Sequence, residues 1–407
     1  MLRWPMMDKG KHDKRRDIAI LDPDFHQDPF DRYAWMREHA PVYWDASAKT
    51  WDTQGAWGIT RYQDIRLVAT SSELYASGGG SRADAPPVPS MINKDAPEHL
   101  ERRALTRRRF TPTAVKRYED YTREIVIRLI DRALERKHCD VVRDLAMPLP
   151  MMVIGRMMDL PEADFEKLLH WSDLIATGIV NMPPDFEQQV YQAAAEFRTY
   201  ISEWFDKRRE SPGDDILSAI VQGKVLGESL GEGDRMHEAL LLLVGGDETT
   251  RHVITGGLHA MLTHSLGLKQ LADDPKLMET AIEEMLRWVT PVKTIARTAT
   301  ARTALDGQTI EAGDKLVLLF ESGNRDAAVF DNPEVFDIYR DPNRHLAFGG
   351  YGRHHCLGSH LARLEIRVMF EELARRVRSI ELNNSAPPRK RFGTFVLGIE
   401  QLQVTMN

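Results

Sequence analysis

The amino-acid sequence predicts a mainly α fold with a minor β region. Five long segments place apolar residues at three- and four-residue spacing, as Leu357, Leu361, Leu364 and Val368 do. This spacing is typical of a helix with one buried face. Strand-like stretches are short and clustered. The chain has 407 residues, of which 42% are hydrophobic, and this composition is that of a folded protein with a large core.

The predicted elements follow in order along the chain. Helices are expected at 118–137, 184–209, 235–265, 275–289 and 357–378. Strands are expected at 57–60, 295–300, 309–310, 316–320 and 395–406, with turns at Asp306-Gly307 and Gly313-Asp314, because such pairs favour tight reversals. The segment 77–90 is glycine- and proline-rich and is predicted to be a flexible loop. Loops of this length serve as lids or binding loops, or are plain surface excursions.

We expect residues 1–21 to form a mobile N-terminal arm and residues 22–407 to form a single domain. The run 9–16 is polar and largely basic, which is typical of a solvated arm. The start has no apolar region of a signal peptide, and no stretch approaches 18 apolar residues. A secretory signal or a membrane anchor is therefore not expected.

Charge and cysteine content narrow the function further. The chain has 54 Lys+Arg and 61 Asp+Glu, for a formal net charge of −7, which argues against general nucleic-acid binding. Its two cysteines, Cys139 and Cys356, are too few for a disulfide framework. A reducing, cytoplasmic location is the expectation.

The two cysteines differ in their surroundings. Cys139 lies at a predicted helix end without a recognisable motif, and we interpret it as structural. Cys356 follows a stretch with glycines at 349, 350 and 352, and precedes the last predicted helix. Glycines let a backbone approach a flat ligand closely, and the N–H groups at a helix start favour thiolate over thiol. Cys356 is therefore a candidate metal ligand.

Three interpretations of Cys356 compete. With His354, His355 and His360 it could bind zinc, but adjacent positions do not converge easily on one tetrahedral ion. It could be an inert buried thiol. It could also be the single axial ligand of a haem iron, which requires one thiolate, a glycine-lined loop and cations elsewhere for the propionates.

The loop around Cys356 resembles the cytochrome P450 family, whose pattern is Phe-x-x-Gly-x-x-x-Cys-x-Gly. Gly352, Cys356 and Gly358 match it. Phe348 stands eight residues before Cys356, one more than in most members, so Gly349 or Gly350 resembles an insertion. Bacterial members that act on sterol side chains and branched lipids share this longer form. The resemblance covers residues 22–407 and implies a triangular helical prism with small antiparallel sheets.

The resemblance also implies an acid–alcohol pair and an internal brace. Glu248 and Thr249 follow two glycines in the helix predicted at 235–265, and in the family this helix opens over the haem. An acid and a hydroxyl there bring protons into an apolar pocket. Glu284 and Arg287, three apart on one helix face, match the family's Glu-x-x-Arg brace.

The implied cofactor is haem b (iron protoporphyrin IX), with Cys356 as the iron ligand. His99 and Arg103 match the family's propionate-binding His-x-x-x-Arg, and Arg297 and His354 match the remaining propionate partners. Substrate-facing positions implied by the family are mostly apolar, namely 89–92, Leu241, Val244, 292–295 and 395–396.

The implied activity is that of a monooxygenase that uses O2 and electrons from NAD(P)H, delivered by a separate ferredoxin reductase and ferredoxin. The expected substrate is hydrophobic: a sterol side chain first, then a terpenoid or a branched fatty chain. A basic face for an acidic ferredoxin is expected from Arg107, Arg108, Arg109, Arg353, Arg363 and Arg367. A peroxide-driven peroxygenase and a non-catalytic haem sensor or carrier are the alternatives, and the acid–alcohol pair counts against the carrier.

Overall fold

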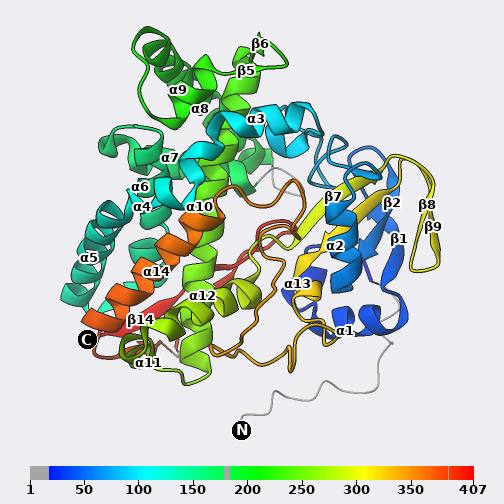
Figure 1. The fold of residues 1–407 in the computed structure, drawn as a ribbon. Coiled ribbons are helices and arrows are strands. Elements are labelled where there is room, and N and C mark those ends of the chain that lie inside the picture. The colour runs from blue at the N-terminus through cyan, green and yellow to red at the C-terminus, as the bar shows by residue number, and fades with distance from the viewer. Residues whose placement is uncertain (1–17, 178–183, 384) are drawn as a thin grey trace.

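Helices gather on one side of the molecule and the largest sheet lies on the other (Figure 1). The computed structural model describes residues 18–177, 184–383 and 385–407. The helices are α1 (Phe30–His39), α2 (Tyr62–Thr70), α3 (Glu98–Thr106), α4 (Pro112–Lys116), α5 (Glu119–Arg136), α6 (Pro148–Met157), α7 (Phe165–Thr177), α8 (Pro184–Glu210), α9 (Ile216–Gln222), α10 (Glu232–Thr263), α11 (Leu268–Asp273), α12 (Pro275–Val289), α13 (Phe320–Gly323) and α14 (Ser359–Arg376).

The strands are short. They are β1 (Val42–Lys49), β2 (Gln54–Ile59), β3 (Tyr75–Ala76), β4 (His138–Asp140), β5 (Lys224–Val225), β6 (Glu228–Ser229), β7 (Thr294–Ala299), β8 (Thr303–Leu305), β9 (Gln308–Ile310), β10 (Lys315–Leu319), β11 (Ile380–Leu382), β12 (Arg389–Lys390), β13 (Ile399–Gln401) and β14 (Gln403–Met406). The largest sheet has the order β1-β2-β10-β7-β3. Its pairings are antiparallel except that β10 runs parallel to β2.

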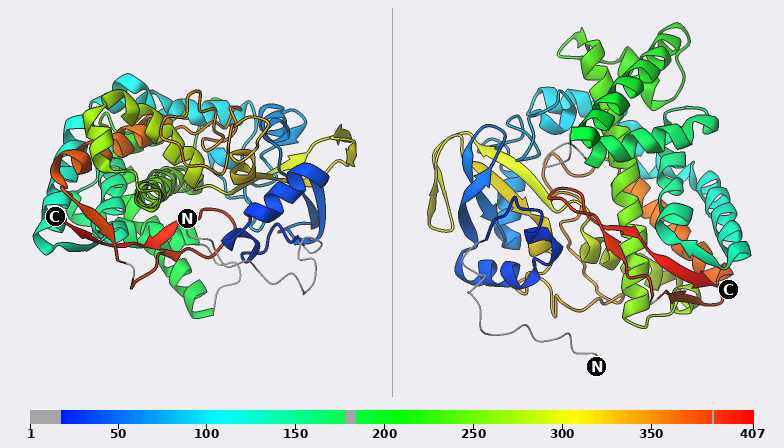
Figure 2. Two further views of the ribbon diagram at one scale, coloured as in Figure 1. Left: turned by 90° about the horizontal axis from the view of Figure 1, so that it is seen from below. Right: turned by 180° about the vertical axis from the view of Figure 1, so that it is seen from behind.

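The predicted mainly α fold with small sheets is confirmed, and all five predicted long helices are present within a few residues. The turn at Asp306-Gly307 joins β8 to β9, and both residues have positive φ, at 45° and 76°. The predicted strand at 395–406 is shorter, because only β13 and β14 form ladders in it. The C-terminal segment crosses from the sheet side to the helical side, as Figure 2 shows from behind.

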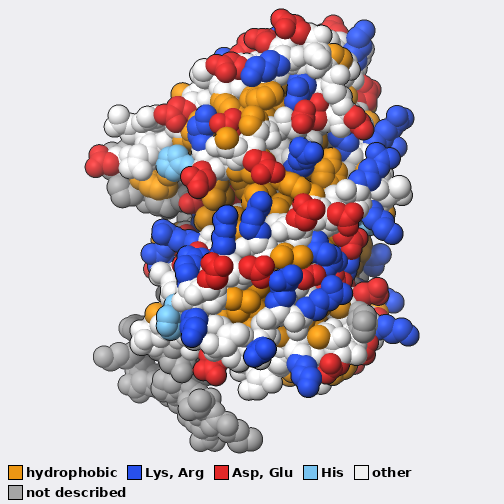
Figure 3. All heavy atoms as spheres, turned by 90° about the vertical axis from the view of Figure 1, so that its left-hand side faces the viewer, with side chains coloured by type: hydrophobic (Ala, Val, Ile, Leu, Met, Phe, Trp, Pro, Cys, Tyr) orange, Lys and Arg blue, Asp and Glu red, His pale blue; other side chains and the backbone are white. Residues whose placement is uncertain are grey.

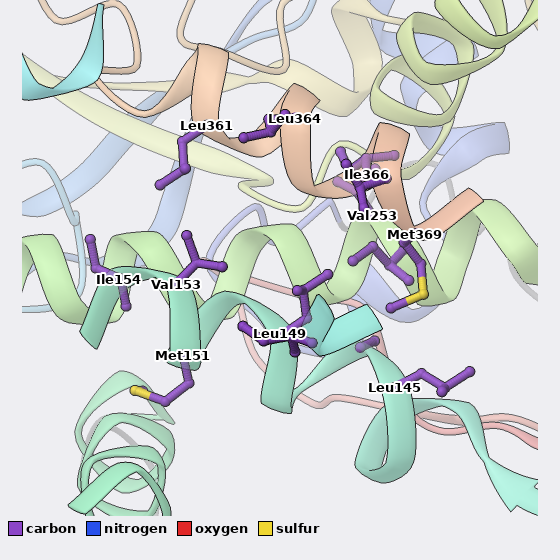
Figure 4. Packing of buried hydrophobic residues seen from close by; sticks show 14 of the residues in the cluster. Leu145, Leu149, Met151, Val153, Ile154, Val253, Leu361, Leu364, Ile366 and Met369 are labelled. Carbon is purple, nitrogen blue, oxygen red and sulfur yellow. The ribbon is translucent and has the colours of Figure 1, made fainter. Parts of the chain in front are cut away.

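The main core lies between helices. Apolar side chains of α6, α10 and α14 interdigitate, among them Leu149, Val253 and Ile366 (Figure 4). Two smaller clusters pack on the largest sheet, one of them around Leu316 and Leu318 of β10. On the helical side, positive and negative side chains are interspersed around an apolar area (Figure 3).

The glycine pair of α10 does not open the helix, contrary to the expectation from the sequence. Residues 232–263 are helical throughout. A Cβ on Gly246 would lie 3.0 Å from the side chain of Ile154 in α6, so this glycine permits a close helix crossing. The predicted opening of the helix was wrong, because Gly246 is explained by close packing against Ile154 of another helix.

The predicted boundary of the N-terminal arm is too late. Ile18 and Ile20 are 3% and 0% exposed and belong to the cluster around Val317 and Leu319 of β10. The packed chain therefore includes residues 18–21, while residues 1–17 of the predicted arm lie outside the described residues. Among the helices that are described, none has both the length and the apolar character required to cross a bilayer.

Candidate active site

The loop before α14 presents Cys356. The backbone N–H of Cys356 donates to the carbonyl of Phe348 at 2.9 Å, and that of His355 donates to Gly352 at 2.9 Å. Burial raises the pKa of the Cys356 thiol, while the N–H of Gly358 and the charges of Arg103 and Arg363 act in the opposite direction. The Cys356 sulfur thus has an N–H donor and two positive side chains near it, and these favour the thiolate form when a metal ion binds the sulfur.

The additional residue in this loop is accommodated in a left-handed turn. Gly349, Gly350 and Tyr351 have φ of 95°, 74° and 70°, a region that glycine enters readily and tyrosine does not. The turn brings the carbonyl of Phe348 to the N–H of Cys356. The Phe348 ring is 9% exposed and lies 4.5 Å from the guanidinium carbon of Arg363. The Phe348 ring therefore packs on Arg363, while the Phe348 carbonyl binds the N–H of Cys356.

The steric requirement for glycine in the loop is strictest at Gly352, while a Cβ on Gly350 would lie 2.9 Å from the side chain of Ala69. A Cβ on Gly352 would lie 2.0 Å from the carbonyl oxygen of Ala69 in α2. By contrast, a Cβ on Gly358 would meet nothing within 4 Å. The loop is thus pressed against α2 at Gly352 and open beside Gly358, next to the cysteine.

The four residues predicted to bind propionates lie together. The rings of His99 (α3) and His354 stack with centroids 3.9 Å apart. Arg103, one turn after His99, donates to the carbonyl of His355 at 2.6 Å. Arg297 (β7) is 5% exposed, and its charge acts on both histidines. The fold assembles these residues from three distant parts of the chain.

We call His99, Arg103, Arg297 and His354 the cationic cluster. None of the four forms an ion pair in the described part of the chain, although the charge of Asp95 acts on His99 and Arg297. Burial and nearby positive charges lower the pKa of His99 to about 4 and that of His354 to about 2, so both rings are neutral at neutral pH, and burial lowers the pKa of Arg297 to about 10. The positive charge is therefore that of Arg103 and Arg297, and buried positive charge is costly unless an anion compensates it. The cluster is thus suited to an acidic ligand.

The predicted brace is present and fully buried. Glu284 and Arg287 of α12 are both 0% exposed and form two hydrogen bonds of 2.7 Å. Arg287 also donates to the carbonyls of Asn324, Pro333 and Val335. Such a pair fixes α12 to the segment that leads into the cysteine loop.

On α10 the acid and the alcohol face different partners. Thr249 is half-buried and donates its hydroxyl to the carbonyl of Gly245 at 3.1 Å. Glu248 is 1% exposed. Both of its oxygens accept from Arg391 at 2.7 Å, and it also pairs with Arg251. The two predicted catalytic residues are thus adjacent on the helix without a hydrogen bond to one another.

The family model for cytochrome P450 matches residues 81–406. The chain belongs to the cytochrome P450 family. This cytochrome P450 is 40% identical over 393 residues to a steroid C26-monooxygenase of Mycolicibacterium smegmatis, with 96% of each chain covered. It is 34% identical over 403 residues to a methyl-branched lipid omega-hydroxylase of Mycobacterium bovis, with 96% of this chain and 93% of the relative covered.

A solved structure agrees with this assignment. The crystal structure of CYP109E1 from Bacillus megaterium in complex with testosterone superposes with a TM-score of 0.84 at 32% identity, covering 95% of this chain and 99% of that chain. The protein is a cytochrome P450 monooxygenase with steroid- and lipid-hydroxylating relatives.

The family implies a haem cofactor, and the residues present fit one. Haem b offers an iron that accepts a thiolate and two propionates that pair with cations. Cys356 supplies the thiol, and the cationic cluster supplies the positive charge of Arg103 and Arg297, neither of which forms an ion pair within the described residues. When bound, a haem-thiolate activates O2 for insertion of one oxygen atom into a C–H bond.

The other cysteine takes no part in this site. Cys139 lies on β4 with its sulfur 3.3 Å from that of Met406. Burial raises its pKa to about 12. The thiol stays protonated at neutral pH, in agreement with a structural role.

Sequence reasoning missed several groups beside Glu248. Arg391 comes from the C-terminal segment, 143 positions away, and no local pattern marks it. Asp247 is the neighbour of Glu248, is 0% exposed, and accepts from Ser172 of α7 at 3.0 Å. Burial raises the pKa of Asp247 to about 7. In the sequence, only the direct succession of Asp247 and Glu248 pointed to Asp247.

Proposed function

We propose that this cytochrome P450 hydroxylates the side chain of a sterol or a similar methyl-branched hydrophobic molecule. The proposal is supported by the charge of Arg103, which lies near enough to Cys356 for the two to interact, and by the packing of α10, which carries Glu248 and Thr249, against α14, the helix that follows Cys356. The substrate class is supported by the steroid C26-monooxygenase and methyl-branched lipid hydroxylase relatives. A terpenoid or a branched fatty chain is the next choice.

Each site residue has a defined role in this proposal. Cys356 ligates the iron as a thiolate, and the cationic cluster neutralises the two propionates. The Thr249 hydroxyl can leave the Gly245 carbonyl to hold a water molecule, because that hydrogen bond is local and weak. Glu248, which pairs with Arg251 and Arg391, exchanges protons with solvent on the far side of the helix.

The electron source in this proposal is NAD(P)H through a ferredoxin reductase and a ferredoxin in the cytoplasm. Of the six arginines expected to form the docking face, four are paired with acids of this chain: Arg109, Arg353, Arg363 and Arg367. Arg107 and Arg108 are exposed, and no ion pair to either occurs within the described ranges. These two are the arginines best able to meet an acidic partner.

The experiment is to incubate the holoenzyme with cholesterol, NADH, a ferredoxin and its reductase under ¹⁸O2. We expect a side-chain alcohol that carries one ¹⁸O atom. Product formed equally well with hydrogen peroxide and no reductase would favour a peroxygenase instead. If no oxidised sterol forms but a terpenoid or a branched fatty acid is turned over, the substrate is a terpenoid or a branched fatty acid instead of a sterol.

Substitution of Thr249 tests the acid–alcohol pair. In Thr249→Ala we expect NADH consumption to continue while product per NADH falls about tenfold or more, because proton delivery is no longer directed. Thr263→Ala is the matched control, since Thr263 is on the same helix and donates to the carbonyl four residues earlier in the same way. Unchanged coupling in Thr249→Ala would remove Thr249 from the relay.

A further inference from the structure

Two adjacent arginines of α3 act on opposite sides of the site. Arg103 belongs to the cationic cluster beside Cys356. Arg102 is 3% exposed and turns to α10, where it contacts Asp234 at 2.6 Å and Glu238 at 3.1 Å. It also contacts Glu98 of its own helix at 2.8 Å. Arg102 therefore ties α3 to the helix that carries Thr249.

Arg102 makes one contact that is not an ion pair. Its Nη1 donates to the carbonyl of Pro89 at 3.0 Å. Two residues further, the backbone N–H of Met91 faces the carboxylate of Glu238. Residues 89–91 are thus fastened to α10 through Arg102, which binds the Pro89 carbonyl and pairs with Glu238.

The ends of the loop 77–93 are attached to the cofactor side of the site. The Ser77 hydroxyl lies 3.0 Å from Nε2 of His354. The carboxylate of Asp95 accepts the N–H groups of Ser77 and Gly78, both at 2.8 Å. Because both ends are fixed at the cationic cluster, any opening of the loop has to occur in its middle, around 82–92.

The opposite edge of this middle stretch is held by separate contacts. The carbonyl of Ala83 accepts from the backbone N–H of Trp51 at 3.0 Å, and Asp84 accepts from the Thr394 hydroxyl at 3.2 Å. The guanidinium of Arg82 lies 5.1 Å from the Phe395 ring, a cation–π contact. These contacts leave the attachment of residues 89–91 to α10 to Arg102.

Glu238 is a buried acid that is only partly satisfied. It is 2% exposed, and its Oε2 has no hydrogen-bond partner in the described part of the chain. Burial raises its pKa to about 7, Arg102 and the Met91 N–H act against this, and Asp234 adds to it. A half-satisfied buried pair stabilises less than a fully paired one, so this contact can be released more easily than the Glu284–Arg287 brace.

We propose that Arg102 and Glu238 form a latch that holds the loop 77–93 against α10 and thereby controls entry and release of the substrate. The latch rests on the proposed function, because it presumes that the pocket lies between this loop, α10 and the cofactor. Arg102 and Glu238 are positioning residues and touch no reacting atom.

The test compares Arg102→Lys with Arg376→Lys in the holoenzyme. Lysine keeps the charge but cannot reach Pro89, Asp234 and Glu238 together. Arg376 is the matched control, since it also pairs with two acids, Asp131 and Glu372, on helices that do not contact the loop. The readouts are hydrogen exchange of the amides in 82–92 and stopped-flow release of 4-phenylimidazole, an azole that coordinates haem iron.

For Arg102→Lys we expect both the exchange of 82–92 and the release of 4-phenylimidazole to accelerate about tenfold, as for loss of a charge-assisted hydrogen bond. Arg376→Lys should leave both unchanged. Glu238→Gln, which keeps the shape and removes the charge, should give a smaller change in the same direction. A folded Arg102→Lys or Glu238→Gln holoenzyme with wild-type exchange and release would overturn the latch.

The two readouts separate the latch from the proposed function. Neither requires a sterol or turnover, so a failure to oxidise cholesterol leaves the latch result unaffected. Conversely, a normal sterol product with unchanged loop exchange in both variants would refute the latch alone.

Discussion

The brace and the cationic cluster bury the same kinds of basic side chain in opposite ways. At the brace, Arg287 is met by Glu284 and by backbone carbonyls, and Glu284 also accepts from Arg340 and Asn343. In the cationic cluster, His99 and Arg297 are buried, Arg103 and His354 are half-buried, and burial together with the charges of the arginines lowers the pKa of both histidines. Glu284 pairs directly with Arg287 at the brace, whereas no residue of the cationic cluster forms an ion pair within the described residues.

This difference shows which part of the site the protein completes by itself. A satisfied network rigidifies the segment that leads to the cysteine loop. A cluster whose positive charges are not paired is stabilised when an anionic ligand binds to it. We therefore expect the two carboxylates of haem to stabilise the holoenzyme at the cluster, and the brace to be independent of them.

The largest effect is expected from breaking the brace. In Arg287→Ala, Glu284 becomes a buried charge with one guanidinium fewer, which lowers the free energy of unfolding by about 3–5 kcal/mol. Chemical denaturation of the holoenzyme measures this. The exposed Arg302–Glu311 pair is the control, since Arg302→Gln should cost less than about 1 kcal/mol. If the free energy of unfolding falls equally in the two variants, the buried brace stabilises the fold no more than an exposed ion pair does.

Two acids differ in the same way, since Glu283 is paired with basic side chains and Asp247 forms no ion pair within the described residues, and the difference predicts opposite effects of pH on stability. Burial opposes ionisation of Glu283, but Arg363 and His345 outweigh it and lower its pKa to about 2, so its stabilisation is lost as pH falls below about 4. Burial raises the pKa of Asp247 to about 7. Protonation of Asp247 therefore stabilises the folded state fully at low pH, and this stabilisation is lost as pH rises toward 7.

Asp247→Asn removes the second dependence. At pH 8 we expect the free energy of unfolding of the variant to exceed that of wild type by about 1–3 kcal/mol, and at pH 5 we expect a smaller excess, because the pH dependence already begins near pH 4. Urea unfolding at the two pH values is the measurement. An equal shift at both pH values would show that the acid of Asp247 is ionised throughout.

A smaller effect is expected at the cationic cluster. Arg297→Gln removes one propionate partner, and we expect haem transfer to apomyoglobin to become about tenfold faster. Arg302→Gln again serves as the control, because Arg302 is exposed on the neighbouring hairpin. A haem-release rate unchanged in Arg297→Gln would place the propionates elsewhere.

Local features were predictable from the sequence. The helix at 275–289 was predicted with its observed bounds, because its apolar spacing and its proline start are local signals. The approach of His99 and Arg103 to Cys356 was not derivable from spacing, since α3 and the cysteine loop are about 250 positions apart. Their likeness to a family pattern provided it.

Long-range features escaped the sequence for a physical reason. The continuity of α10 at Gly246 depends on Ile154 of α6, and the environment of Glu248 depends on Arg391 from the C-terminal segment. Neither partner can be inferred from residues near the motif. The motif identified which residues matter, while their contacts required the structure.

Ligation of haem by Cys356 is tested most directly by the absorbance of the reduced, carbon-monoxide-bound protein, recorded for wild type and for Cys356→Ser. We predict a strongly red-shifted Soret band in wild type that is absent in the variant, because only a thiolate ligand produces that shift. A wild-type protein without haem, or a red-shifted band that persists in Cys356→Ser, would contradict the site described above.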